Sequence, residues 1–296
     1  MALAMKLNNI SNAFFVLILF IFVVFFVVPL IFGIYISLTD WTGVTKDYSF
    51  IGIDNYVKMM RDTRSANAVK TTAQYLALLL PTTLIVGYIN ATILHNLAKA
   101  RNLFAFISFF PYVITPVAVS LLWNQIYYKL FVSIGKLTNI GFLKSNLLSN
   151  PNTALIAVAI VDLWMLIPFS TLLFYSSFSA ISAHQVNAAK LDGARNINVF
   201  RYIKFPYLLP TIGTLISVIV SYSLTHIDTI MTLTRGGPGR TTETLYYLIY
   251  QNSMADKRYG FGAAEGIVIS VVSIFIYLLL SKMTNSNNLK NISLGD

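Results

Sequence analysis

Long segments without charged residues constrain this 296-residue chain more than any other feature of its sequence. The first such segment runs from Ala13 to Leu38, which is too long for the apolar core of a signal peptide (about 7–15 residues). Because lipid offers the backbone no hydrogen-bond partners, an apolar segment of about 20 residues predicts a membrane-spanning helix. Six segments predict transmembrane helices, over residues 13–38, 71–94, 102–128, 153–178, 205–227 and 261–280.

The composition favours one membrane bundle over soluble domains. Only 11% of the residues are charged and the mean hydropathy is +0.68, whereas a soluble domain averages about 25% charged residues. We therefore predict an all-α membrane protein with a single domain over residues 1–296. The net charge of +10 is scattered over loops, so lipid headgroups are expected neighbours and nucleic acid is not. The chain has no cysteine, which excludes disulfides and cysteine-based metal sites, and no metal site is predicted.

The connections between the apolar segments carry most of the polar residues. The stretch "FIGIDNYVKMMRD", residues 50–62, is typical of a short amphipathic helix. "RGGPG", residues 235–239, predicts a tight turn with another amphipathic helix after it. Lysine and arginine are spread over both sets of loops, so the positive-inside bias leaves the orientation undecided.

A charged stretch of residues 183–204 separates the fourth predicted helix from the fifth. Ser182 and Gln185 form an S-x-x-Q capping box, which predicts the start of a short helix. Gly193 permits a sharp change of direction because glycine accepts positive φ. We expect a second short helix over 197–204 and a restart framed by two prolines. An interfacial loop without a specific role is the alternative interpretation.

The order of residues in "NAAKLDGARNINVFRYIKFPYLLP" resembles the EAA signature of permease subunits of bacterial ABC importers. That signature contains E-A-A, D-G-A and I-x-x-P-x-L-x-P, and this chain has Asn187 in place of the leading Glu. Other stretches resemble the binding-protein-dependent sugar permeases of the maltose and glycerol-3-phosphate type. They are "SLTDWTG", "FFPYVITPVAVSLLWNQIY", "VDLWMLIPFSTLLF" and "LTRGGPGRTTETLYYLIYQNSM".

The resemblance implies a type I ABC importer transmembrane domain whose segment 183–204 is a cytoplasmic coupling helix. It places the multi-pass chain in the bacterial cell membrane with both termini in the cytoplasm. The implied partners are a second, paralogous permease, two ATPase subunits, an extracytoplasmic solute-binding protein and a sugar substrate. The residues expected to couple to the ATPase are Asn187, Ala188, Ala189, Asp192, Gly193, Ala194 and Arg195.

The chain itself is predicted to be a transport subunit without enzymatic activity or a cofactor. It has no G-x-x-x-x-G-K-[ST] motif, whose backbone would cradle phosphate. ATP and Mg²⁺ are therefore expected on the partner ATPase subunits.

Polar and aromatic residues within the predicted helices are candidates for the substrate pathway, because ionisable groups in a membrane are costly and are often functional. Aromatic rings with hydroxyl and acidic neighbours suit sugars. By register with the resembled family, Tyr112, Asp162, Phe169, Ser223 and His226 line the pathway. Helical spacing adds Met165, which shares a face with Asp162, and Tyr222, four residues before His226. Packing or interfacial roles are the alternative for each of them. Binding-protein docking is expected at Gly236, Gly237 and Pro238.

Two other classes of function compete with an ABC importer permease. An ion-coupled secondary transporter acting alone would need buried carboxylates near the membrane midplane, for which Asp162 and Glu265 are candidates. A membrane-embedded enzyme is disfavoured because the three histidines lie far apart and no H-E-x-x-H motif occurs. Within the importer interpretation, the solute stays open between sugars, glycerol-3-phosphate and sialic acid.

Overall fold

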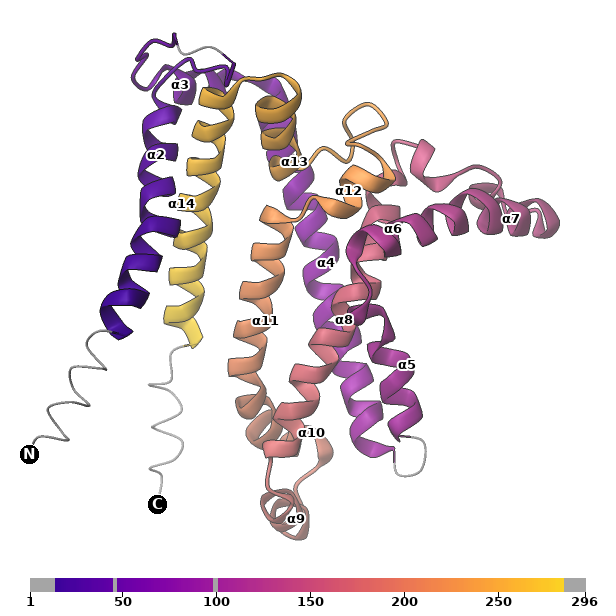
Figure 1. The fold of residues 1–296 in the computed structure, drawn as a ribbon. Helices are drawn as coiled ribbons and strands as arrows, with labels where there is room; N and C mark the ends of the chain where they lie inside the picture. The colour runs from indigo at the N-terminus through magenta and orange to yellow at the C-terminus, as the bar shows by residue number, and fades with distance from the viewer. Residues whose placement is uncertain (1–13, 45–46, 98–100, 285–296) are drawn as a thin grey trace, which may run out of the picture. The chain divides into compact units, whose positions relative to one another are not determined.

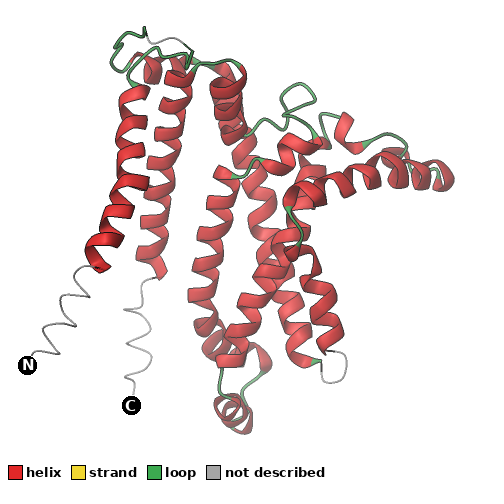
Figure 2. Ribbon diagram, in the orientation of Figure 1, coloured by secondary structure: helices red, strands yellow, loops and turns green. Residues whose placement is uncertain are grey.

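The computed structural model describes residues 14–44, 47–97 and 101–284, and this part of the chain is built from helices and loops (Figures 1 and 2). Its described helices include six that are long and apolar enough to span a membrane, which confirms the predicted fold class. The six are Phe14–Ser37, Thr63–Asn96, Pro116–Thr138, Ala154–Ala180, Asn196–Thr225 and Tyr259–Leu279. Ala13, the first residue of the first predicted helix, and both chain termini lie outside the described residues.

In chain order the elements are η1 (Val23–Val27), α2 (Val28–Ser37), α3 (Asp54–Arg61), α4 (Thr63–Asn96), α5 (Arg101–Val113), α6 (Pro116–Gln125), η2 (Ile126–Phe131), α7 (Val132–Thr138), η3 (Gly141–Leu143), η4 (Leu147–Ser149), α8 (Ala154–Ala180), α9 (Ala183–Leu191), α10 (Asn196–Val199), η5 (Phe200–Lys204), α11 (Phe205–Thr225), α12 (Asp228–Leu233), α13 (Leu245–Tyr250), η6 (Gln251–Ala255) and α14 (Tyr259–Thr284). The amphipathic helices expected after "FIG" and after "RGGPG" are present as α3 and as α13 with η6.

The chain forms two compact units. The first comprises Met1–Thr63 and Ile249–Ser270, and the second comprises Arg64–Leu248 and Val271–Asp296. The single domain over residues 1–296 stays a prediction.

In the first unit, α3 fastens the end of the first membrane helix. The side-chain amide of Asn55 donates to the carbonyl oxygens of Ser37 and Thr39, both at 2.8 Å. Gly260, at the start of α14, donates its N–H to Trp41 O at 3.0 Å. A Cβ at Gly260 would collide with the Thr39 carbonyl, so glycine permits this close approach of two backbones.

In the second unit, α8 is the most buried of the candidate membrane helices. In its most apolar stretch of 18 residues, 56% of the residues are buried. α5, α6, α11 and α12 pack against it (Figure 1). Gly87 of α4 also lies directly against Ser170 of α8, whose Oγ donates to Thr83 O at 3.1 Å. Small residues allow such close helix packing in membranes.

The third membrane helix differs from the continuous helix predicted over 102–128. α5 ends before Thr115, whose extended backbone (φ −65°, ψ 143°) precedes Pro116 at the start of α6. Proline disfavours a helical conformation in the residue before it, and the helix therefore breaks here. With 13 residues, or about 20 Å, α5 is shorter than the hydrocarbon core. α6, η2 and α7 form one rod that points away from α8 (Figure 1).

The fifth membrane helix also differs from its prediction, because it does not restart at the prolines. The helical backbone runs from Asn196 to Thr225 without interruption, as α10, η5 and α11. Pro206 lies in the first turn of α11, and the preceding turn, η5, is a π-helix. Proline breaks helices through its missing N–H and its clash with an earlier carbonyl. A wider π-turn adjusts the hydrogen-bond register next to such a residue.

Candidate functional site

The carboxylate of Asp162 is the centre of a hydrogen-bonded cluster in the second unit. Its side chain is 0% exposed. Tyr75 Oη and Thr229 Oγ1 donate to Oδ2, the latter at 2.9 Å, and Tyr222 Oη donates to Oδ1 at 2.7 Å. His226 Nε2 lies 3.5 Å from Oδ1. A buried carboxylate needs such donors because burial removes its water.

The Asp162 cluster bridges the joint between α11 and α12. α11 ends at Thr225, His226 is extended (φ −82°, ψ 133°), and α12 begins at Asp228. Tyr222 comes from the helix before the joint and Thr229 from the helix after it. One side chain of α8 thus connects both sides of the joint and, through Tyr75, also α4.

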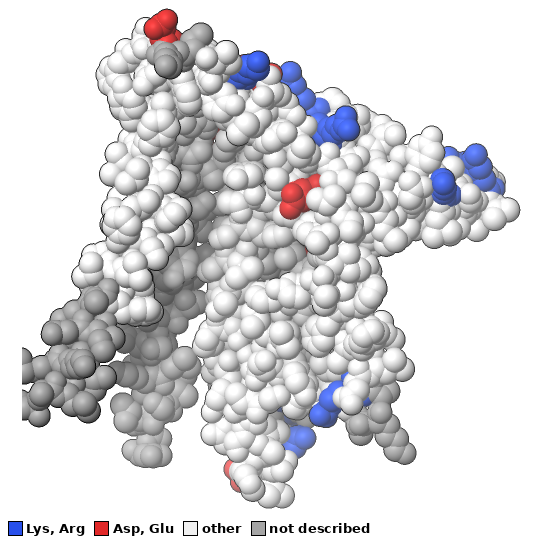
Figure 3. Space-filling view, in the orientation of Figure 1, with Lys and Arg blue, Asp and Glu red and all other residues white. Residues whose placement is uncertain are grey.

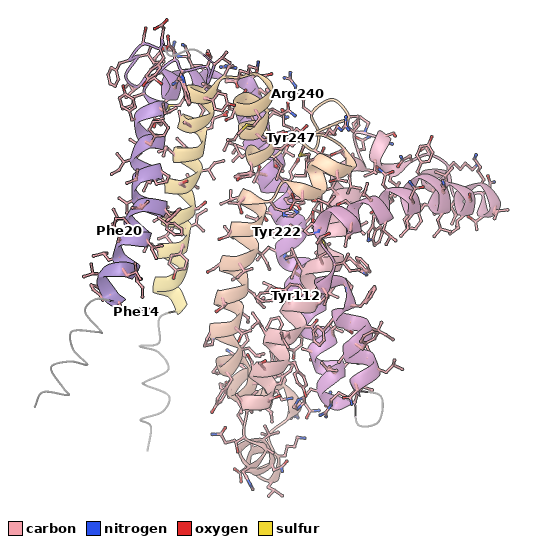
Figure 4. All side chains as sticks on the ribbon, viewed as in Figure 1. Phe14, Phe20, Tyr112, Tyr222, Arg240 and Tyr247 are labelled. Carbon is pink, nitrogen blue, oxygen red and sulfur yellow. The ribbon has the colours of Figure 1, made fainter. Side chains whose placement is uncertain are left out.

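Two aromatic pairs lie among the predicted pathway residues. Tyr112 is 55% exposed and its ring stacks on that of Phe169, with ring centroids 5.8 Å apart. The rings of Tyr222 and His226 stack at 4.1 Å; Tyr222 is half-buried and the His226 side chain is only 10% exposed. Stacked rings with polar groups at their edges can offer a sugar both an apolar face and hydrogen bonds. Figure 4 labels Tyr112 on α5 and Tyr222 on α11.

The remaining predicted pathway residues are enclosed by packing. Met165 and Ser223 are buried, and Ser223 Oγ donates to Ile219 O at 2.8 Å within its own helix. The pathway role of all seven residues stays a prediction. Sequence reasoning missed Tyr75 and Thr229 as partners of Asp162, although a lone tyrosine in an apolar segment is a signal that it needs a partner for its hydroxyl.

The predicted coupling segment is exposed in this structure. Ser182 is the N-cap of α9 but makes no capping hydrogen bond with its side chain, so that half of the predicted capping box is wrong. Asn187, Ala188, Asp192, Gly193 and Arg195 are exposed, whereas Ala189 and Ala194 are half-buried.

Gly193 adopts positive φ (81°), as expected for the turn between the two short helices. A Cβ built at this position meets nothing within 4 Å. The requirement for glycine here is therefore a matter of backbone conformation, not of space.

The predicted docking turn is compact and internally bonded. Gly236 is buried with φ 79°, and a Cβ there would lie 2.7 Å from the Tyr247 ring. Thr242 Oγ1 donates to Gly237 O at 2.8 Å. Gly237 and Pro238 are half-buried, whereas Arg240 is exposed on the loop, where Figure 4 labels it. Of the residues predicted for docking, Gly236 alone is buried, and their docking role stays a prediction.

A buried ion pair attaches this turn to α4. Arg64 Nη2 donates to Glu243 Oε1 at 2.7 Å, and Arg64 Nε contacts both carboxylate oxygens at 3.1–3.2 Å. The Glu243 side chain is 3% exposed. Leu245 N also donates to Thr72 Oγ1 at 2.9 Å. A bidentate guanidinium–carboxylate pair fixes both distance and orientation.

In the first unit, Glu265 is buried and accepts a hydrogen bond from the Asn252 amide at 2.8 Å. The sequence did not indicate Asn252 as a partner of Glu265. Arg258 stacks on the Phe261 ring at 4.2 Å. Within the described residues, no group of three or more His, Cys, Asp or Glu side chains could hold a metal ion.

Comparisons with known proteins cover most of the chain. No protein-family model matches it. The multiple sugar-binding transport system permease protein MsmF of Streptococcus mutans is 32% identical over 262 residues, which are 88% of this chain and 90% of that protein. The protein named "Probable starch degradation products transport system permease protein AmyD", from Thermoanaerobacterium thermosulfurigenes, is 29% identical over 259 residues, 86% of this chain and 88% of that protein.

A solved structure shares the fold. The bacterial alginate ABC transporter, in complex with its alginate pentasaccharide-bound periplasmic protein, contains a chain that matches with a TM-score of 0.81 at 19% identity. The match covers 97% of this chain and 96% of that chain. The two chains therefore share a fold over nearly their whole length.

Proposed function

Because this chain belongs to the permease subunits of sugar ABC transport systems, we propose that it forms half of the translocation path of an ATP-driven carbohydrate importer. The observation that carries the proposal is the exposed segment α9–Gly193–α10, whose sequence matches the EAA signature and which lies between two membrane helices. An exposed polar helix pair on an otherwise apolar protein is suited to docking on a separate subunit.

Movement of the coupling segment would reach the membrane directly. α10, η5 and α11 form one uninterrupted helical rod, so a displacement at Asn196 is carried along the rod towards Thr225. The Asp162 cluster lies at the far end of this rod, at the joint with α12. Closure of the ATPase subunits on ATP and Mg²⁺ would thus shift α11 as a rigid body and change the joint.

The partners and the orientation follow from this role. The coupling segment docks on one of two ATPase subunits in the cytoplasm, so both termini are cytoplasmic and the multi-pass chain lies in a bacterial cell membrane. A second, paralogous permease supplies the other half of the path. The turn at Gly236, Gly237 and Pro238 shapes the outer surface on which a solute-binding protein docks. The periplasmic protein bound in the alginate transporter supports such a partner.

Within the path, the aromatic pairs Tyr112–Phe169 and Tyr222–His226 contact the sugar. Asp162 is a positioning residue that holds Tyr222 and the α11–α12 joint, since its oxygens already accept three hydrogen bonds. Met165 and Ser223 pack behind these groups.

Reconstitution in proteoliposomes tests the proposal. The chain with its permease and ATPase partners should accumulate sugar only when ATP and the binding protein are present, and the chain alone should accumulate none. Uptake by the chain alone, driven by an ion gradient, would instead support a secondary transporter. A thermal-shift screen of the cognate binding protein against sugars, sialic acid and glycerol-3-phosphate identifies the solute.

A further inference from the structure

A pocket of about 250 Å³ lies where the coupling segment meets the ends of α4 and α8. Its walls come from four places in the chain that are far apart in sequence: α4, the end of α8, α9 and η5. Tyr88, Phe178 and Val186 supply apolar surface. The pocket is separate from the Asp162 cluster and from the docking turn, and it has no role in the proposed transport path.

Three polar side chains that line this pocket make no hydrogen bond or ion pair with another described residue: His95, Asn187 and Lys204. Two other lining side chains are already bonded within α4. Thr92 Oγ1 donates to Tyr88 O at 2.8 Å, and Asn96 Nδ2 donates to Thr92 O at 2.9 Å. The His95 ring is held by edge contacts with the Phe178 and Tyr175 rings, at centroid distances of 5.8 and 6.3 Å.

The formal charge among the described residues that line this pocket is positive. Lys204 is half-buried, and no Asp or Glu is among the described residues that line the pocket. Figure 3 shows two small groups of Lys or Arg atoms near the lower ends of the helices around α10, and Asp or Glu atoms at α9, so the single sign of charge applies to the pocket lining. A partly desolvated ammonium without a counter-ion is costly, and an anion in the pocket would remove that cost.

Asn187 explains why the pocket needs an anion from outside. It stands at the signature position where a glutamate is expected, and here it lines the pocket together with Lys204. A glutamate at this position would place a carboxylate in the same pocket as the ammonium. With asparagine, the pocket keeps its cation and gains an amide N–H₂ donor instead.

The geometry points to a binding site for a phosphate-bearing anion, held by Lys204 and Asn187 with His95 beside them, between the coupling segment and α4. Bound there, the anion links η5 and α9 to α4 and so restrains the segment that transmits ATP-driven motion. Free phosphate and the phosphate of an acidic lipid headgroup share this chemistry. The volume admits a phosphate group of either origin.

Direct binding tests the site without any reliance on transport. The full-length chain is purified with the subunits that remain bound to it and is placed in phosphatidylcholine nanodiscs. Inorganic phosphate is then titrated in one arm, and phosphatidylglycerol replaces part of the lipid in the other, with binding followed by thermal shift and ³¹P NMR. Binding in the first arm identifies free phosphate, and binding in the second arm alone identifies a lipid headgroup.

Matched variants separate the pocket from general surface charge. Lys204→Gln and Asn187→Glu should each weaken binding about tenfold, because each removes or neutralises a charge-assisted contact. Lys190→Gln makes the same charge change on α9 outside the pocket lining, and should alter affinity less than twofold. Elution volume in size exclusion verifies that each variant is folded.

Three outcomes would overturn the inference. These are absence of binding in both arms, equal losses of affinity in the Lys190 and Lys204 variants, and phosphate binding that is lost when the ATPase subunit is removed from the purified complex. The last would assign the pocket to that subunit.

Discussion

Two glycine-containing connections of the second unit differ in how strongly they are bonded to the rest of the chain. The turn at Gly236 and the coupling segment at Gly193 both depend on positive φ, at 79° and 81°. The turn is tied to α4 by the Arg64–Glu243 pair and has a buried glycine at its base. The coupling segment is exposed along α9, and its only side-chain hydrogen bond to another described element is a 3.4 Å contact of Tyr207 with Gln185.

The difference indicates which surface is complete by itself. The turn keeps its shape through bonds within this chain, so the partner proposed to dock there would meet a preformed surface. The coupling segment leaves Leu191, Ile197 and Tyr202 exposed, so its surface is not covered by the packing of this chain. Changes in the turn should therefore act on stability, and changes in the coupling segment should act on transport.

The largest loss of stability is expected from Arg64→Ala. It leaves the buried Glu243 carboxylate without its cation, which costs about 3–5 kcal/mol. Thermal unfolding in detergent measures the effect. The double variant Arg64→Met with Glu243→Leu removes both charges and should recover most of the loss. Unfolding of Arg64→Ala at the temperature of the unchanged protein would show that the turn is not anchored by this pair.

A smaller loss, of about 2–3 kcal/mol, is expected from Asp162→Ala, because buried hydroxyl donors lose their acceptor. Asp162→Asn retains one acceptor oxygen and should lose less. Unfolding temperature and the KM for uptake are measured together. A stable Asp162→Ala protein with a greatly raised KM would mean that Asp162 contacts the sugar directly and does not act as a positioning residue.

Gly193→Val should cost about 1–2 kcal/mol through backbone strain, because a β-branched residue disfavours positive φ. ATP-dependent uptake should nevertheless be lost while membrane insertion is kept. Gly193→Asn is the control, since asparagine tolerates this conformation and the surrounding space is open. Normal uptake by the valine variant would remove the coupling role from this turn.

The smallest effect on stability, within about 0.5 kcal/mol, is expected for Leu191→Ala, because its side chain is 88% exposed. The variant should still weaken co-purification with the ATPase subunit. Leu137→Ala, at an 86% exposed leucine of α7, is the matched control and should leave co-purification unchanged. Equal ATPase recovery with both variants would contradict the docking surface.

Local sequence signals predicted much of this fold correctly. Mostly apolar segments located six candidate membrane helices, with shifted bounds for the third, because insertion into lipid depends on composition over about 20 residues. The turn at Gly193 was predicted correctly because a single residue type, glycine, readily adopts positive φ. The predicted helix ends were wrong where the apolar length of a segment and the position of its prolines indicated different boundaries. Pro116 broke the third helix, whereas the prolines after η5 did not break the fifth.

The candidate site depended on tertiary structure. The sequence by itself determined that Asp162 is an ionisable group within an apolar helix and that the coupling segment carries an importer signature. Only the folded chain decided that Tyr75, Tyr222 and Thr229, which are 87, 60 and 67 residues from Asp162, supply its hydrogen bonds. Helical periodicity relates residues three and four positions apart. Partners from separate helices are selected by packing, which places Asp162 where its carboxylate links α8 to α4, α11 and α12.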